Sequence, residues 1–88
     1  MTPTSFKFHL SIPRDASLVP VVRDLAAHAA VYTQLDAEAG AQFAARVAAA
    51  SQRALTAEPG ACAVDFSCAE GELLVTIGGE TVRQALPA

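Results

Sequence analysis

The side chains best suited to chemistry in this sequence are two cysteines and two histidines, Cys62, Cys68, His9 and His28. The spacing of the cysteines matches no zinc-binding pattern, and both histidines lie far from them in the chain. If Cys62 and Cys68 share one strand, they are roughly 20 Å apart at about 3.3 Å per residue, too far for a disulfide. We expect two small buried thiols, a solvated His9 on the outer face of a strand, and His28 at the edge of a helix.

The glycine pair Gly78–Gly79 is the next candidate, because glycine-rich backbone can cradle a phosphate. Such a site needs a helix N-terminus after the glycines, and the short tail Thr81–Ala88 hardly forms one. A turn or the end of a strand is the better interpretation. Glu70 and Glu72 flank a turn glycine and are ordinary solubilising residues. The sequence therefore predicts no catalytic, cofactor-binding or metal-binding residue.

Composition limits the class of protein. The chain has 88 residues, which predicts a single domain over 1–88. Its apolar fraction is 52% and its charged fraction only 17%, so we expect a surface that is unusually apolar for so small a chain. The net charge is −3 and the six basic residues are scattered, which argues against nucleic-acid binding. No signal peptide and no membrane span is visible, so we expect a cytoplasmic protein.

The stretch Asp36–Ala57 organises the chain. Ten of its 22 residues are alanine, Asp36 is a good N-cap, and Pro59-Gly60 ends the helix. Its apolar face must be buried, and the alanines predict close approach to neighbouring elements. That face comprises Phe43, Val47, Ala50 and Ala54, widened by Ala44, Ala48 and Leu55.

The other helix and strands are predicted from changes in the spacing of apolar residues along the chain. Ser5–Ile12 alternates as a half-buried strand, and Ser17–Tyr32 has helical spacing, with Leu18, Val22, Leu25, Ala29 and Tyr32 on one face. The period returns to two in Cys62–Cys68 and Leu73–Ile77, which predicts a hairpin. The tail Thr81–Ala88 is ambiguous between a brief strand and a frayed end.

The predicted order is therefore β-α-α-β-β. Two helices pack on one face of a small three-stranded sheet, which gives an α+β fold in the form of a two-layer sandwich.

The run FHLSIPRDASLVPVVRDL resembles the opening of the anti-sigma factor/serine kinases of bacterial partner-switching systems, in the histidine-kinase/Hsp90-like ATPase superfamily. The shared pattern is a strand that ends in a small residue plus proline, then a helix with x-V-P-x-V-R. The alanine-rich helix and the V-x-F-x₆-L-x-V-x-I hairpin also match that layout. The resemblance runs from Phe6 to about Glu80 and covers only the first half of the family's domain.

The family's functional positions are not retained. Alignment of the long helix by its apolar face places Ala49 where the family has a general-base glutamate, and Arg53 where it has a magnesium-ligating asparagine. Alanine has no proton chemistry and arginine does not ligate a hard cation. The family's Asp-x-Gly-x-Gly loop corresponds to Gly78-Gly79-Glu80-Thr81, which lacks the aspartate. The resemblance therefore implies loss of ATP binding and of kinase activity.

These observations favour a non-catalytic interaction or regulatory module, a truncated and degenerate relative of the anti-sigma ATPases. We expect its partner to be itself, as a homodimer, or a regulatory protein. In the relatives the first strand and first helix lie near the dimer contact, which implies these interface residues: Lys7, His9, Ser11, Val21, Val22 and Arg23. The alternatives are a nucleotide-binding remnant or small enzyme that uses backbone groups near Gly78-Gly79, and a subunit of a larger complex.

Overall fold

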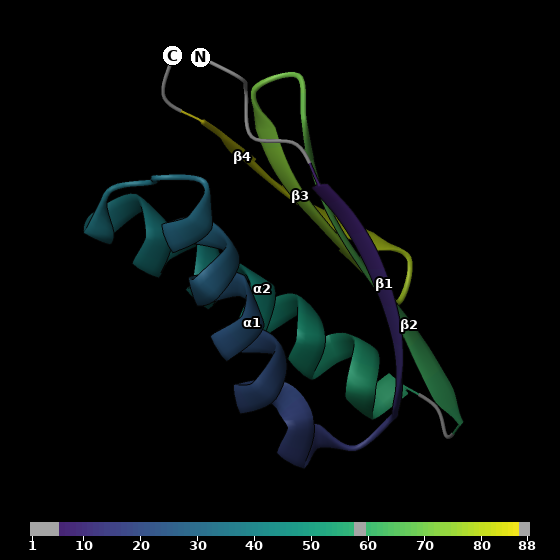
Figure 1. The fold of residues 1–88 in the computed structure, drawn as a ribbon. Helices are drawn as coiled ribbons and strands as arrows, with labels where there is room; N and C mark the ends of the chain where they lie inside the picture. Colours follow the sequence, from purple (N-terminus) through teal and green to yellow (C-terminus); the bar gives the residue numbers. More distant parts are fainter. Residues whose placement is uncertain (1–5, 58–59, 87–88) are drawn as a thin grey trace.

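Two helices lie on one face of an antiparallel sheet with the strand order β1-β2-β3-β4 (Figure 1). This computed structural model describes residues 6–57 and 60–86. The elements are β1 (Phe6–Pro13), a short 3₁₀ helix η1 (Ala16–Leu18), α1 (Val19–Tyr32), α2 (Ala37–Ala57), β2 (Ala61–Ala69), β3 (Glu72–Ile77) and β4 (Glu80–Ala85). The predicted α+β class and the two-layer arrangement are confirmed.

The prediction of three strands is wrong, because residues Glu80–Ala85 form a fourth strand. Ile77 pairs with Glu80, so Gly78 and Gly79 alone make the turn, with φ of +58° and +88°. Two-residue turns with two positive φ values suit the twist of a hairpin and favour glycine. Val82 on β4 is partly buried against the core, and this burial of apolar surface favours pairing of β4 with β3.

The preceding hairpin has the same construction. Ala69 pairs with Glu72, and the two residues between them, Glu70 and Gly71, have φ of 55° and 77°. The predicted turn at this position is confirmed. β1 then pairs antiparallel with β2, from Phe6 opposite Cys68 to Pro13 opposite Ala61, so β1 lies at the edge of the sheet.

The predicted apolar face of α2 forms the centre of the core. Phe43 and Val47 are fully buried, and the alanines of that face are buried or nearly so, together with Leu55. Ser51 is also buried. Its hydroxyl donates to the carbonyl of Val47 at 2.7 Å, so the buried hydroxyl has a hydrogen-bond partner. Asp36 caps the helix by accepting from the backbone N–H of Ala39 at 2.7 Å, as predicted.

The two helices approach each other closely. A Cβ atom placed on Gly40 of α2 would lie 3.3 Å from the Cβ of Ala30 of α1, so small residues at this crossing let the backbones come near. The side of α1 that is buried comprises Val22, Ala26, Ala29 and Ala30. Tyr32, placed by its spacing on the predicted apolar face, is instead 65% exposed.

Candidate interaction site

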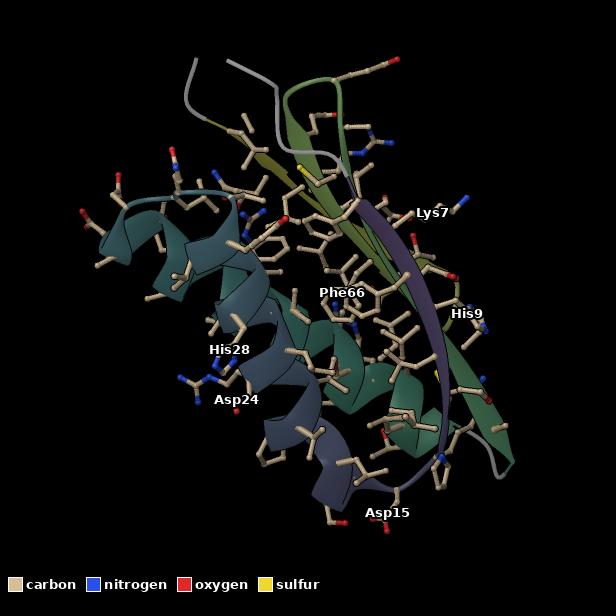
Figure 2. All side chains as sticks on the ribbon, in the orientation of Figure 1. Lys7, His9, Asp15, Asp24, His28 and Phe66 are labelled. Atoms are coloured by element: carbon tan, nitrogen blue, oxygen red, sulfur yellow. The ribbon has the colours of Figure 1, made fainter. Side chains whose placement is uncertain are left out.

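The open edge of the sheet is formed by β1, which has one apolar and one polar face. Figure 2 shows Lys7 and His9 directed away from the helices, on the outer face of the sheet, while Phe66 lies between the sheet and the helices. Phe8 stacks on the buried Phe66, with ring centroids 4.8 Å apart and planes 9° apart. Because β1 has only one neighbouring strand, Phe8 stays 41% exposed although it points to the core side.

A hollow of about 280 Å³ opens between β1 and α1. Its lining is mostly apolar and consists of Phe6, Phe8, Leu25, His28, Ala29 and Tyr32. The ring of Phe6 meets that of Tyr32 edge-on at a centroid distance of 5.6 Å, which fixes one end of the hollow. Exposed aromatic groups around an open apolar hollow are typical of a surface that binds another macromolecule.

The predicted interface residues fall into three groups. Lys7, His9 and Ser11 are exposed on the outer face of β1, and Val21 and Arg23 are exposed on α1. Val22 has no exposed surface, because it points into the core between the two layers. The prediction that Val22 belongs to the interface is therefore wrong, because another chain cannot contact its side chain.

Both histidines have hydrogen-bond partners. Nδ1 of His9 donates to the Asp65 carboxylate at 2.6 Å across the β1–β2 pair, and both side chains are exposed. Nδ1 of His28 lies 2.8 Å from the backbone carbonyl of Asp24, one turn earlier in α1, and donates to it. The predicted exposure of both histidines is confirmed. The pairing of His9 with Asp65 was not predicted, because it depends on the register of two strands far apart in sequence.

The two positions aligned with the ATPase active site have ordinary surroundings. Ala49 is exposed on α2. Arg53 donates through Nε and Nη2 to the Glu80 carboxylate, at 2.9–3.2 Å, and so joins α2 to β4. These hydrogen bonds, followed by the attraction of the opposite charges, raise the pKa of Arg53. Hydrogen bonding to Arg53 lowers the pKa of Glu80.

Within the described part of the chain, the remaining chemical groups do not gather into a site. Cys62 and Cys68 are buried in β2 and are not joined in a disulfide, as predicted. Burial raises the pKa of the Cys68 thiol, which disfavours the reactive thiolate. Across residues 6–57 and 60–86, no group of three or more His, Cys, Asp or Glu side chains is placed to hold a metal ion. Neither described helix combines the length and hydropathy that a membrane span needs.

The glycine pair Gly78–Gly79 lies in the β3–β4 turn, on the side of the sheet that faces the end of α2. A Cβ atom on Gly78 would lie 2.6 Å from the Cβ of Ala54 and 3.4 Å from its Cα. The turn and this close approach together account for both glycines without a ligand.

Comparison of the chain with family models, curated proteins and solved structures gives no match. The resemblance to the anti-sigma factor kinases therefore stays a prediction.

The residues that line the hollow were missed as a site by sequence reasoning. Phe6 and Phe8 were expected on the core side of β1, and Leu25 and Tyr32 on the apolar face of the first helix. The available signal was the number of such residues, since one α1 face carries more large side chains than the alanine-rich α2 can cover. That signal indicates surplus apolar surface but does not place it beside β1.

Proposed function

We propose that this chain is a non-catalytic protein-interaction or regulatory module that forms a homodimer. The observation that carries the proposal is the apolar hollow at the open edge of the sheet, with Phe8 and Tyr32 41% and 65% exposed around it. A chain of 88 residues has a small core, so covering such a surface with a partner adds stability that folding alone does not supply.

The surroundings of the ATPase-like positions support a module without catalysis. Arg53 is engaged in an ion pair with Glu80, and Ala49 offers no group that could move a proton. By the resemblance, an ancestor used these two positions for a general base and for a magnesium ligand. The chain would then have kept the scaffold and its contact surface and lost the chemistry.

The second candidate function is a nucleotide-binding remnant or small enzyme that uses backbone groups near Gly78-Gly79. Its support is the glycine pair itself, and the hairpin geometry gives that pair a structural reason. The third is a subunit of a larger complex, which the exposed hollow would suit equally.

Light scattering after size exclusion, at micromolar concentration and above, tests the homodimer. We expect a mass near twice the 9.1 kDa of one chain. A single species at the mass of one chain would contradict the proposal.

A thermal-shift screen with ATP, ADP and GTP in the presence of magnesium tests the absence of nucleotide binding. We expect unchanged melting temperatures. A rise of several degrees with one nucleotide, abolished by Gly79→Ala, would favour the remnant instead, because that substitution alters the backbone that would hold the phosphates.

A further inference from the structure

We propose that the open edge of β1 binds an extended segment of another protein. The segment adds an antiparallel strand to the sheet, places an aromatic side chain in the hollow and sets an acidic residue beside Lys7. This contact rests on the proposed function in taking the hollow as a contact surface, and it adds a partner that competes there with the second copy. Four features support it: the outward backbone groups of β1, the occupied backbone of the opposite edge, the exposed face of Phe8, and the charge of Lys7.

Every second residue of β1 turns its backbone groups to the open edge. The N–H of Arg14 donates to the carbonyl of Gly60 at 2.8 Å, where the register of β1 and β2 continues. Because hydrogen-bonded and non-hydrogen-bonded pairs alternate in an antiparallel ladder, the even-numbered residues of β1 bond to β2. An added strand can bond to the residues that direct their N–H and C=O groups outward, which are Lys7, His9 and Ser11.

The opposite edge of the sheet, β4, is less open. The N–H of Leu86 donates to the carbonyl of Gly71 at 2.8 Å, so by the same alternation the carbonyl of Arg83 points outward. Nη1 of Arg46 donates to that carbonyl at 2.9 Å. A segment that pairs with β4 has to displace this guanidinium, whereas pairing with β1 needs no such displacement. The extended segment is therefore expected at β1.

The exposed face of Phe8 indicates which side chain lies opposite it. Phe66 covers the other face of the Phe8 ring at a centroid distance of 4.8 Å, which is also about the 4.8 Å spacing of neighbouring strands. Phe8 is 41% exposed because β1 has no strand on its open side. Since Phe8 bonds to β2, it faces an added strand as a non-hydrogen-bonded position, where opposed side chains lie closest. An aromatic side chain there extends the stack by one strand.

The hollow sets the size and kind of that aromatic side chain. A cavity of about 150 Å³ holds benzene, so the hollow of about 280 Å³ accommodates a larger ring such as indole. His28 lines the hollow, and its Nδ1 is already bonded to the carbonyl of Asp24. Nε2 of the neutral ring is left to accept from an indole N–H or a tyrosine O–H. We therefore expect Trp or Tyr opposite Phe8.

Lys7 sets the charge of the next residue in the segment. Its side chain points to the outer face (Figure 2), and among the described residues it belongs to no ion pair. Its neighbour on β2 is Ser67, and Asp65 on the same face is held by His9 at 2.6 Å. An acidic residue opposite Lys7 in the added strand forms a favourable cross-strand pair. A second copy of β1 contains neither Asp nor Glu, so the segment comes from another protein.

A peptide titration tests the chemistry of the segment. The probe is the synthetic peptide Ser-Thr-Val-Thr-Trp-Glu-Val-Thr-Ser, whose Glu faces Lys7 when its Trp faces Phe8 in an antiparallel pair. The chain contains no tryptophan, so the fluorescence of the peptide reports binding directly. We expect the emission to shift to shorter wavelength and to saturate as protein is added, and Phe8→Ala to weaken binding about tenfold or more. An unchanged emission with the wild type would overturn the inference.

A charge exchange tests the register. Replacement of the peptide Glu by Lys should weaken binding to the wild type roughly fivefold, and the order of the two peptides should reverse for Lys7→Glu. Arg83→Glu is the matched control, because it makes the same change in net charge at an exposed position on the opposite edge. It should keep the wild-type order. A Lys7→Glu variant that also keeps this order would overturn the pairing of Lys7 with the acidic residue.

Amide hydrogen exchange tests the added strand itself. The peptide should slow exchange at the outward amides of Lys7, His9 and Ser11, and leave the even-numbered amides of β1 and the amide of Arg83 little changed. Binding without this alternating protection would overturn strand addition. Protection of the outward amides in the chain alone, rising with protein concentration, would show that a second copy occupies the edge and would also overturn the inference.

Light scattering of the chain alone decides the homodimer separately. A dimeric wild type that does not bind the peptide contradicts this inference only. A monomeric wild type that binds the peptide with the expected protection contradicts the homodimer only.

Discussion

Gly78 lies directly against Ala54, so that a Cβ atom on the glycine would be 2.6 Å from the Cβ of the alanine. The β3–β4 turn is therefore seated on the last turns of α2 with no room for a side chain. The contact joins the β3–β4 turn to the C-terminal part of α2.

Gly78→Ala should lower the free energy of unfolding by about 2–4 kcal/mol, because it adds overpacking against Ala54 to a left-handed backbone conformation that suits glycine. Urea denaturation followed by circular dichroism measures the loss. Gly79→Ala is the matched control, since φ is +88° there and nothing lies within 4 Å. It should cost only about 1–2 kcal/mol. Equal losses for the two variants would show that the contact with Ala54 is unimportant.

Replacement of Glu80 should change the response of stability to acid. Arg53 lowers the pKa of Glu80 below its usual 4.5, so the folded chain releases that proton more readily than the unfolded chain. The stabilisation is fully present above the usual pKa and is lost as pH falls through the pKa of the folded chain. Wild type should therefore exceed Glu80→Gln in stability near neutral pH, and the difference should vanish in strong acid. A difference that is constant with pH would contradict this origin.

Substitutions in the stacked pair Phe8 and Phe66 should distinguish an effect on stability from an effect on association. Phe66→Ala opens a cavity at a fully buried position and should cost about 3–5 kcal/mol. Phe8→Ala removes a ring that is 41% exposed and should cost about 1 kcal/mol in dilute solution. Chemical denaturation at low concentration gives both values. Light scattering should then show that Phe8→Ala weakens the dimer although the chain stays folded.

The two cysteines should be unreactive in the native chain. Cys62 and Cys68 have 0% and 1% exposed surface, and burial raises the pKa of the Cys68 thiol. An aromatic disulfide reagent at mildly alkaline pH should therefore react slowly with the folded protein and fast with both thiols after unfolding. Fast labelling of one thiol under native conditions would show that β2 opens locally.

The candidate site could be predicted only in part from the sequence. Alternation in β1 correctly placed Lys7, His9 and Ser11 on the exposed face, because a period of two depends on the strand alone. Val22 was included only by analogy with the dimer contact of the relatives, although its helical spacing had already placed it on the apolar face, and it is fully buried in the core. The hollow was not predictable, since it requires knowing that α1 runs beside an edge strand.

The sequence by itself determined the α+β class, the Asp36 cap, the apolar face of α2 and the outward face of β1. These features depend on periodicity and local hydrogen bonds, which neighbouring residues specify. Only the tertiary structure decided that Glu80–Ala85 pairs as a strand, that Arg53 holds Glu80, and that Phe8 and Tyr32 remain exposed. Burial and pairing depend on what lies across from a residue, and in this chain those neighbours come from distant parts of the sequence.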